Sequence, residues 1–314
     1  MVSVATTHSK GLSSFEPLLT SHLLSPALGR CLRATLSVPL ALGAFRLWQV
    51  LELWWLAPLG PQAQAAAALG ASLRWCALSI SVGLATAGMG LIAECIAQHD
   101  QHSANAVAWL VGALALALNV FLSVLGLVLA PQLLSLLALP ADLLPPALAY
   151  LRTALASLAP MGVLLALGAV WQAVGNSPLM TLVQVPAWGL SIAALQPLVY
   201  GWAGRPGLGI GGAALTAGLG TASMAIVQVM LLGRGWGGGV RLERSSLALI
   251  PRYLWPLLKR AGRPVLQLAS CALAQVILMS VIAGSGVTVL AGFAAARSLL
   301  LLLLVPSLAM GNLA

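Results

Sequence analysis

Charged side chains are scarce in this 314-residue chain, where Asp, Glu, Lys and Arg together make up 7% of the residues. A soluble globular domain carries about 25% charged residues, so the composition excludes that class of protein. Hydrophobic residues reach 60%, and apolar stretches of about 20 residues, enough to cross a bilayer as a helix, recur along the chain. Because only helices and closed barrels satisfy their backbone in lipid, the sequence predicts an all-α polytopic membrane protein.

Motifs of hydrolases, metalloenzymes and nucleotide-binding loops are also lacking. The chain has no GxSxG, HExxH or P-loop pattern, and its four cysteines form no CxxC pair, so neither a disulfide framework nor a zinc site is indicated. The loop QHDQH contains His99, Asp100 and His102, but without further ligands at a suitable spacing we interpret it as a solvated loop. We therefore expect no enzymatic activity, no cofactor and no metal site.

A glycine pattern, GxGxxG at residues 207–212, has the spacing of a dinucleotide-binding turn. Such a turn needs a preceding strand and an acidic residue about 20 positions later, whereas here an apolar span precedes it and the next acid is Glu243. Gly212, Thr216 and Gly220 step by four instead, which places small residues on one face where helices pack closely in lipid. We interpret this segment as the start of a membrane helix.

Eight membrane spans are predicted from the apolar stretches and from the Pro, Gly, Asn and Asp residues between them. The net charge of +9 comes from basic residues in loops, with no stripe of interleaved basic and aromatic residues that would indicate nucleic-acid binding. Since short cytoplasmic loops retain Lys and Arg, we expect a cytoplasmic N-terminus in the plasma (inner) membrane; an organelle membrane is the alternative. The predicted spans are residues 35–57, 67–97, 105–130, 147–171, 179–201, 208–232, 264–284 and 288–312.

Features of the first span recur near the end of the chain. Pro39 and Gly60 have counterparts in Pro264 and Gly286, at an offset of 225 to 226 residues, which indicates a repeated bundle of the kind found in transporters. On this interpretation four helices of the second bundle are expected elsewhere, in the same gene or in another chain. The predicted division is a cytoplasmic N-terminal tail (1–33), a first six-helix bundle (34–232), a basic cytoplasmic linker (233–263) and a partial second bundle of two helices (264–314).

Three polar residues interrupt the first span. Arg46, Gln49 and Glu52 step by three, which places them within an arc of about 120° on one helix face. Burying a charge in a span costs about 2.5 to 3.5 kcal/mol on insertion scales, so such residues are functional candidates. Arg46 and Glu52 lie about 9 Å apart along the helix axis, and Gln49 could bridge them. We predict a cation- or proton-binding site here; a static network that locks helix packing is the alternative.

Two further arginines lie inside predicted spans. Arg74 could pair with Glu52 across the bundle or extend towards the membrane interface, and its place near the predicted helix start favours the interface. Arg297 in the last span has the same two options. Trp48, inside the first span, is expected in the core or in the lining of a cavity.

The order and spacing of several short motifs resemble the MATE (multidrug and toxic compound extrusion) family of transporters. In that family a first-helix carboxylate is followed some eight residues later by a glycine and an alanine-rich stretch, matched by Glu52 and Gly60 in ELWWLAPLGPQAQAAAA. The similarity covers most of residues 30–314 and implies two six-helix bundles, of which this chain contains the first and two further helices. The other motifs are VGLATAGMGLIAECIAQHDQ, AYLRTALASLAP, GNSPLM, GLGIGGAALTAGL, RPVLQLASCALAQ and GSGVTVLAGFAAARS.

The resemblance implies export of organic cations or metabolites in exchange for H⁺ or Na⁺. Glu52 matches the first-helix carboxylate, which is usually Asp. The fifth-helix pair of Asn or Asp residues falls on Ser191 and Leu195, with Gln196 adjacent, and Thr216 matches a small hydroxyl residue of the sixth helix. Half of this oxygen set is missing, and Na⁺ needs several oxygen ligands, so proton coupling through Glu52 is favoured.

We therefore predict a secondary active antiporter for organic cations, drugs or metabolites, with a small-molecule substrate and the lipid bilayer as partners and no nucleic acid. One alternative is a lipid-linked precursor flippase or polysaccharide exporter, which should present more basic residues in its cavity, whereas here only Arg46, Arg74 and Arg297 could serve. The other is a nontransporting membrane remnant or scaffold. The expected proton- or cation-binding residues are Glu52, Gln49 and Arg46, and the expected cavity-lining residues are Ser191, Gln196, Thr216 and Trp48.

Overall fold

A computed structural model describes most of the chain as helices. The prediction of an all-α protein is confirmed, apart from a two-residue antiparallel hairpin that joins two helices. The described residues are 26–137, 139–140, 142–175, 177–202, 205–236, 240 and 249–307, with side chains from Pro39 onward in the first helix. The elements are α2 (Pro26–Leu56), η1 (Ala57–Leu59), α3 (Pro61–Ala97), α4 (Gln101–Leu136), α5 (Leu144–Ala156), α6 (Leu158–Ala173), α7 (Ser177–Tyr200), β1 (Gly201–Trp202), β2 (Arg205–Pro206), α8 (Ile210–Gly233), α9 (Ile250–Gly284) and α10 (Val287–Leu303).

Each predicted span lies on one of these helices or on a helix pair, except that the last five residues of the final span lie outside the described residues. By length and apolar composition, α3, α4, α7, α8 and α9 could each cross a membrane, as could α5 and α6 taken together. The 17-residue α10 is shorter, and α2, which carries the polar stripe, is not in this set. The first and last spans thus remain predictions.

The fourth predicted span is broken rather than straight. Its two halves, α5 and α6, meet at Ser157 with a bend of 48°. Pro160, two residues into α6, has no backbone N–H and cannot bond to the carbonyl of Ala156, which explains why the helix does not continue through this point.

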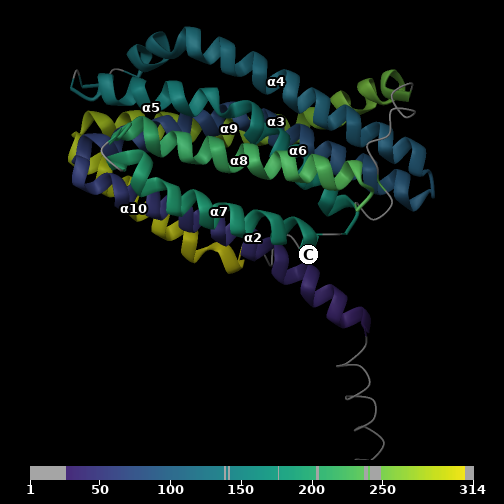
Figure 1. The fold of residues 1–314 in the computed structure, drawn as a ribbon. Helices are drawn as coiled ribbons and strands as arrows, with labels where there is room; N and C mark the ends of the chain where they lie inside the picture. The colour runs from purple at the N-terminus through teal and green to yellow at the C-terminus, as the bar shows by residue number, and fades with distance from the viewer. Residues whose placement is uncertain are drawn as a thin grey trace, which may run out of the picture.

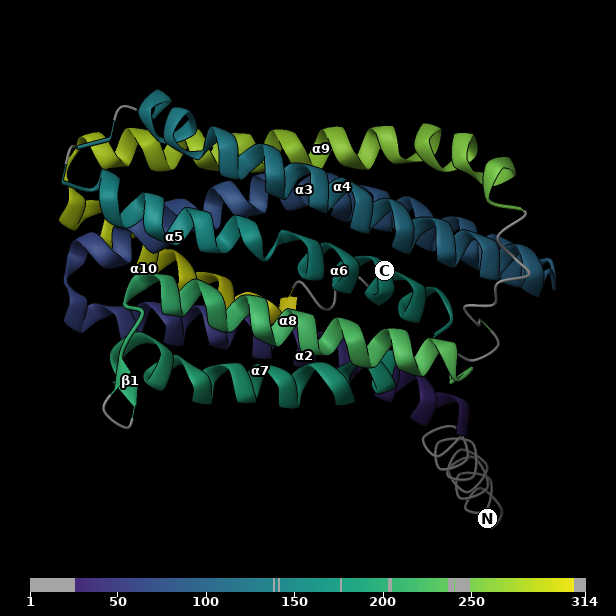
Figure 2. The same ribbon diagram turned by 45° about the horizontal axis from the view of Figure 1, so that its top comes forward.

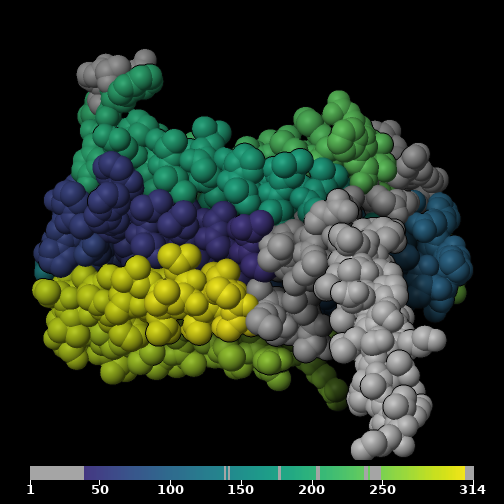
Figure 3. All heavy atoms as spheres, turned by 90° about the horizontal axis from the view of Figure 1, so that it is seen from below, coloured from purple at the N-terminus to yellow at the C-terminus, as the bar shows by residue number. Residues whose placement is uncertain are grey.

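The helices lie side by side in one bundle (Figure 1 and Figure 2). The most extensive helix contact among the described residues joins α3 and α9, and α2 packs chiefly against α7. Seen from below, α2 (purple) lies between α7 (teal) and α10 (yellow) in Figure 3. Large apolar side chains are exposed on the outer faces, where a bilayer would cover them; examples are Phe121, Val128, Leu182 and Leu266.

The predicted basic linker, residues 233–263, is partly helical. Helix α9 begins at Ile250, whereas the predicted span began at residue 264, so the second half of the predicted linker is helix. Residues 241–248 lie outside the described residues, as do residues 1–25 of the predicted tail. The division into domains remains a prediction.

The four residues that suggested an internal repeat occupy matching places in the fold. Pro39 lies inside α2 and Pro264 inside α9. Gly60 directly precedes α3 with φ of 96°, and Gly286 directly precedes α10 with φ of 121°. Positive φ favours glycine because it has no Cβ. The same local conformation therefore recurs at the predicted offset.

The small face of α8 allows the close packing that the sequence predicts. A Cβ atom added at Gly212 would overlap the carbonyl oxygen of Leu198, and one added at Gly220 would overlap the side-chain oxygen of Ser191. Both neighbours belong to α7. The glycine-rich segment is thus a helix–helix contact. The strand before it, β2, is only two residues long and pairs with β1 in an antiparallel hairpin, unlike the strand of a dinucleotide-binding unit.

The QHDQH loop is the turn that starts α4. The Asp100 carboxylate accepts a hydrogen bond of 3.0 Å from the backbone N–H of Ser103, which caps the helix. Hydrogen bonds from Ser103 hold the pKa of the Asp100 carboxyl below its usual value. In the described part of the chain, no three His, Cys, Asp or Glu side chains gather in a way that could hold a metal ion.

An exposed ion pair between α3 and α9 should contribute little to stability. Arg260 Nη1 lies 2.6 Å from Glu94 Oε1, and both side chains are about half exposed, at 47% and 53%. Exposed pairs of this kind contribute about 0–1 kcal/mol because water and salt screen them. We expect Arg260→Gln to leave the melting temperature of the detergent-solubilised protein nearly unchanged; a loss as large as that of a core substitution would contradict this.

Candidate functional site

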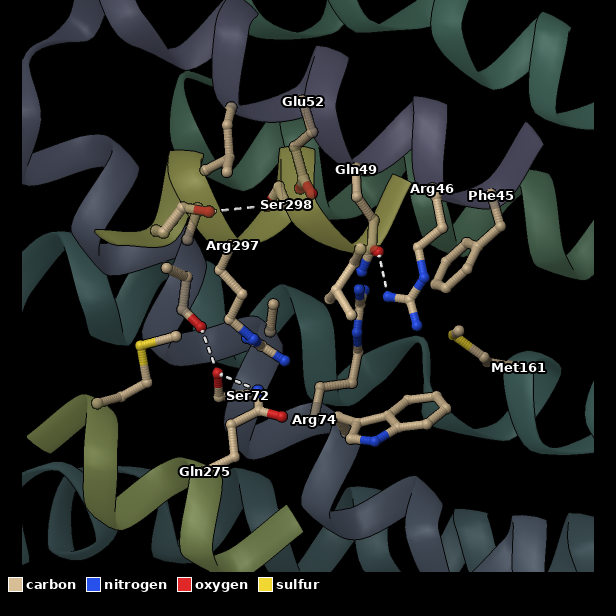
Figure 4. A pocket seen from close by; sticks show the side chains of 18 residues that line it. Phe45, Arg46, Gln49, Glu52, Ser72, Arg74, Met161, Gln275, Arg297 and Ser298 are labelled. Atoms are coloured by element: carbon tan, nitrogen blue, oxygen red, sulfur yellow. Dashed lines mark hydrogen bonds between the residues drawn. The ribbon is translucent and has the colours of Figure 1, made fainter. Parts of the chain in front are cut away.

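The polar residues predicted in the first span line a cavity of about 90 Å³ between α2, α3, α9 and α10. Its walls come from both the predicted first bundle and the two helices that follow it. Figure 4 shows the side chains pointing into the shared space. The polar lining residues used below are Arg46, Gln49, Glu52, Arg74, Gln275 and Arg297.

Of the three polar residues predicted to form a stripe on α2, the described structure joins only Arg46 and Gln49 by a hydrogen bond. Arg46 Nη1 donates a hydrogen bond of 2.7 Å to Gln49 Oε1. No hydrogen bond joins Gln49 to Glu52 among the described residues. Gln49 therefore does not form the bridge between Arg46 and Glu52 that the sequence allowed. The physical reason is that Glu52 has another partner, the hydroxyl of Tyr150 on α5, which donates a hydrogen bond of 2.8 Å to Glu52 Oε1.

Tyr150 is a site residue that sequence reasoning did not identify. It lies 98 residues from Glu52 and is fully buried, while Glu52 is 4% exposed. Gly70 on α3 leaves room for the tyrosine ring, since a Cβ atom there would overlap it. A single tyrosine in an apolar helix carries no signal of its partner, although the pairing of an intramembrane acid with some polar group was to be expected.

Arg74 lies inside the bundle, and its predicted extension to the membrane interface is wrong. Helix α3 begins at Pro61 rather than at residue 67, which places Arg74 more than three turns inside the helix. The side chain is 3% exposed and lines the cavity. Its guanidinium interacts electrostatically with Glu52. Among the described residues, Arg74 Nη1 has no hydrogen-bond partner.

Arg297 extends from α10 into the same cavity. Its charge repels that of Arg46, whose Nε atom is buried without a hydrogen-bond partner in the described part of the chain. Within that part, no carboxylate oxygen lies within 4.0 Å of any of the three cavity arginines, since the one ion pair at this distance is Arg260 with Glu94. The cavity thus combines three cationic side chains with one carboxylate.

A second, larger cavity of about 260 Å³ adjoins the first and shares Arg46 with it. Aromatic and apolar side chains from α2, α3, α6 and α7 form most of its walls. The rings of Phe45 and Trp188 lie 5.0 Å apart between centroids, and Trp48 lies behind them, 5.3 Å from Trp188. The two cavities also have Phe45, Trp75 and Met161 in common.

Comparison with protein families matches residues 40–194, which include the polar stripe, to the MatE family. The match covers just under half of the chain. The resemblance stated from the sequence motifs is thereby confirmed. No curated protein sequence matches the chain.

Solved structures of MATE transporters share this fold. An inward-facing multidrug resistance MATE transporter has 22% identity and a TM-score of 0.76, covering 88% of this chain and 63% of its own. An outward-facing form has 21% identity and a TM-score of 0.76, covering 92% and 64%. A MOP superfamily transporter from Pyrococcus furiosus has 21% identity and a TM-score of 0.75, covering 90% and 62%. The chain therefore spans less than two thirds of their length, and the likeness establishes its fold.

The MATE fold does not bring the remaining predicted residues into these cavities. Ser191 and Thr216 are buried between helices, and their hydroxyls donate to carbonyls of their own helices, at 2.9 Å and 2.6 Å. Trp48 is fully buried behind the aromatic wall. Gln196 lines a separate pocket beside Trp202. None of the four lines either cavity, and their binding roles remain predictions.

Proposed function

We propose that this MATE-family chain moves small molecules across a membrane by secondary transport, and that Glu52 couples the movement to protons. The observation that supports this most directly is a buried carboxylate facing a cavity, held by one tyrosine hydroxyl and with no cation in ion-pair contact among the described residues. A carboxyl group in that setting can hold or release a proton without breaking a salt bridge.

Protonation of Glu52 changes the charge of the cavity. With Glu52 ionised, three arginines and one carboxylate give a net charge of +2; with Glu52 protonated, the net charge is +3. A proton can shift the transporter between inward- and outward-facing states only if the two states bind it with different affinity. Because the cavity is lined both by α2 and α3 and by α9 and α10, movement between these helix pairs would alter the surroundings of Glu52.

A proton suits this site better than Na⁺ does. A hard cation is held by several oxygen ligands, whereas a proton needs only the single carboxylate of Glu52. The predicted oxygen donors Ser191 and Thr216 lie outside the cavity. We therefore retain H⁺ as the proposed coupling ion.

The substrate class follows from the charge of the cavity. The sequence predicts an organic cation, but a cavity with a net charge of +2 disfavours one unless the cation stays away from the arginines. A second candidate function is therefore the export of an anionic, lipid-linked precursor, because an exporter of such molecules should present basic residues in its cavity. The neighbour from Pyrococcus furiosus is itself described as having a binding pocket of reverse polarity and a different function.

The proposed setting is the plasma (inner) membrane, with the N-terminus in the cytoplasm. It is supported by the basic residues of the segment between α8 and α9, since cytoplasmic loops retain positive charge.

Transport by lipid vesicles containing the purified chain tests the proposed function. We expect an imposed pH gradient, but not a Na⁺ gradient at equal pH, to drive movement of at least one permanently charged probe, either 2-naphthalenesulfonate or (2-naphthyl)trimethylammonium. Fluorescence of the naphthyl group measures how much probe accumulates in the vesicle lumen, and vesicles without protein give the background rate. Equal rates in loaded and empty vesicles under both gradients would favour the nontransporting alternative.

A further inference from the structure

Three arginines from three helices point into one cavity whose walls offer one carboxylate. Arg46 comes from α2, Arg74 from α3 and Arg297 from α10 (Figure 4). Burying positive charges without partners is costly, so intramembrane arginines are normally paired or face a wet cavity. Here the one carboxylate, Glu52, already accepts a hydrogen bond from Tyr150. The cavity therefore has positive charge to offer to a ligand.

The other elements around the cavity do not balance this charge. Helices α6 and α9 contribute uncharged side chains. Tyr150 of α5 reaches Glu52 with a neutral hydroxyl. The titratable or charged groups that face Glu52 are thus Arg46 on its own helix, Arg74 on α3, Tyr150 on α5 and Arg297 on α10.

Two guanidinium nitrogens in this cluster are buried with no hydrogen-bond partner among the described residues, Nη1 of Arg74 and Nε of Arg46. The side chain of Arg74 is only 3% exposed and extends towards Gln49 and Arg46 (Figure 4). Guanidinium groups bind carboxylates, sulfonates and phosphates through two parallel hydrogen bonds. An anionic group in the cavity would satisfy these donors and reduce the repulsion between Arg46 and Arg297.

The larger cavity lies next to this cluster, on the side where Phe45, Trp75 and Trp188 form the wall. Its volume of about 260 Å³ is suited to a small aromatic or branched apolar group, which would leave water when it enters. Arg46 lines both cavities. A molecule whose anionic group meets the arginines can thus place its apolar part in the larger cavity.

We propose that the two cavities form one binding site for an amphipathic anion, with Arg46, Arg74 and Arg297 holding the anionic group and the aromatic cavity holding the apolar part. This site rests on the proposed transport function and specifies its substrate class. Loss of the negative charge on Glu52 favours anion binding in the same cavity, and by reciprocity a bound anion favours the protonated carboxyl. The anion and the proton thus bind together, whereas an organic cation would compete with the proton.

Calorimetric titration of the full chain in a neutral detergent tests this site. The probes are 2-naphthalenesulfonate and (2-naphthyl)trimethylammonium, which share a ring system and carry permanent opposite charges. We expect the sulfonate to bind at least tenfold more tightly than the ammonium. Arg74→Gln and Arg297→Gln should each weaken sulfonate binding at least tenfold. Arg152→Gln, an exposed arginine of α5 outside both cavities, is the matched control and should bind like the wild type.

Glu52→Gln separates anion binding from a general loss of structure. This variant is permanently neutral at the position, so it should bind the sulfonate at least as tightly as the wild type and without the strengthening that the wild type shows as pH falls. Arg297 is only partly buried, so its replacement should disturb folding less than replacement of Arg74. If Arg74→Gln does not fold, sulfonate binding by Arg297→Gln tests the role of the arginines. Equal or tighter binding of the ammonium, or wild-type affinity in Arg297→Gln, would overturn the proposal.

A competition arm identifies the source of the anion. Displacement of the sulfonate by dihexanoyl phosphatidic acid, but not by dihexanoyl phosphatidylcholine, indicates that the natural ligand is a lipid phosphate. Displacement by neither lipid indicates a water-soluble anion. Each of these two results supports the site. Sulfonate binding without gradient-driven transport in vesicles would leave the site standing and reject the transport function. Proton-driven movement of the ammonium probe without sulfonate binding would reject the site alone.

Discussion

Replacement of Glu52 by glutamine is expected to reduce pH-driven probe movement in vesicles to the level of empty vesicles. Glutamine has the same shape and still accepts a hydrogen bond from Tyr150, so the buried contact of 2.8 Å is kept. It cannot exchange a proton, so the charge of the cavity no longer changes. The expected loss is at least tenfold in initial rate, with an unchanged melting temperature.

Glu94→Gln is the matched control, because it makes the same chemical change at an exposed position outside the cavity. It should transport at the wild-type rate. Tyr150→Phe removes the hydroxyl that holds Glu52 but leaves the carboxyl, so it should retain part of the pH-driven rate and shift its pH profile. Full pH-driven movement in Glu52→Gln would remove Glu52 from the coupling mechanism.

Substitution of Gly83 is expected to have the largest effect on stability. Gly83 lies at the contact of α3 with α9, and a Cβ atom there would lie 2.6 Å from the backbone nitrogen of Val265 and 2.7 Å from its Cα. Backbone atoms cannot move aside without shifting the helix. Overpacking of this kind costs on the order of 1–3 kcal/mol, and the contact is the most extensive between two helices of the described chain. We expect Gly83→Ala to lower the melting temperature clearly and Gly83→Leu to prevent docking of α9.

Gly90→Ala on the same helix is the control, since a Cβ atom at Gly90 meets nothing within 4 Å. Alanine favours helix over glycine by about 0.5–1 kcal/mol, so this variant should be as stable as the wild type or slightly more so. Scanning fluorimetry of the tryptophans in detergent compares the two. Equal melting temperatures for Gly83→Ala and Gly90→Ala would show that α3 and α9 are not closely packed at this point.

The structure confirmed several predictions that depend on local sequence. Apolar length and loop residues located the helices, because a backbone in lipid must form helices wherever the apolar stretches are long enough. The step of four residues in Gly212, Thr216 and Gly220 predicted the close packing of α8. The equivalent glycines Gly60 and Gly286 were recognised from their spacing alone. The break at Ser157 was missed, since proline is tolerated in membrane helices and does not by itself reveal a bend.

By itself, the sequence determined that this is a helical membrane protein that resembles the MATE family and that Arg46, Gln49 and Glu52 share a helix face. Only the tertiary structure decided which side chains of other helices lie next to them. Arg74, Tyr150 and Arg297 come from three other helices, and whether a buried charge is balanced depends on distances across the bundle that helix periodicity does not contain. The cavity that these residues line carries a net charge of +2, and from that charge we propose an anionic substrate in place of the organic cation that the sequence predicts.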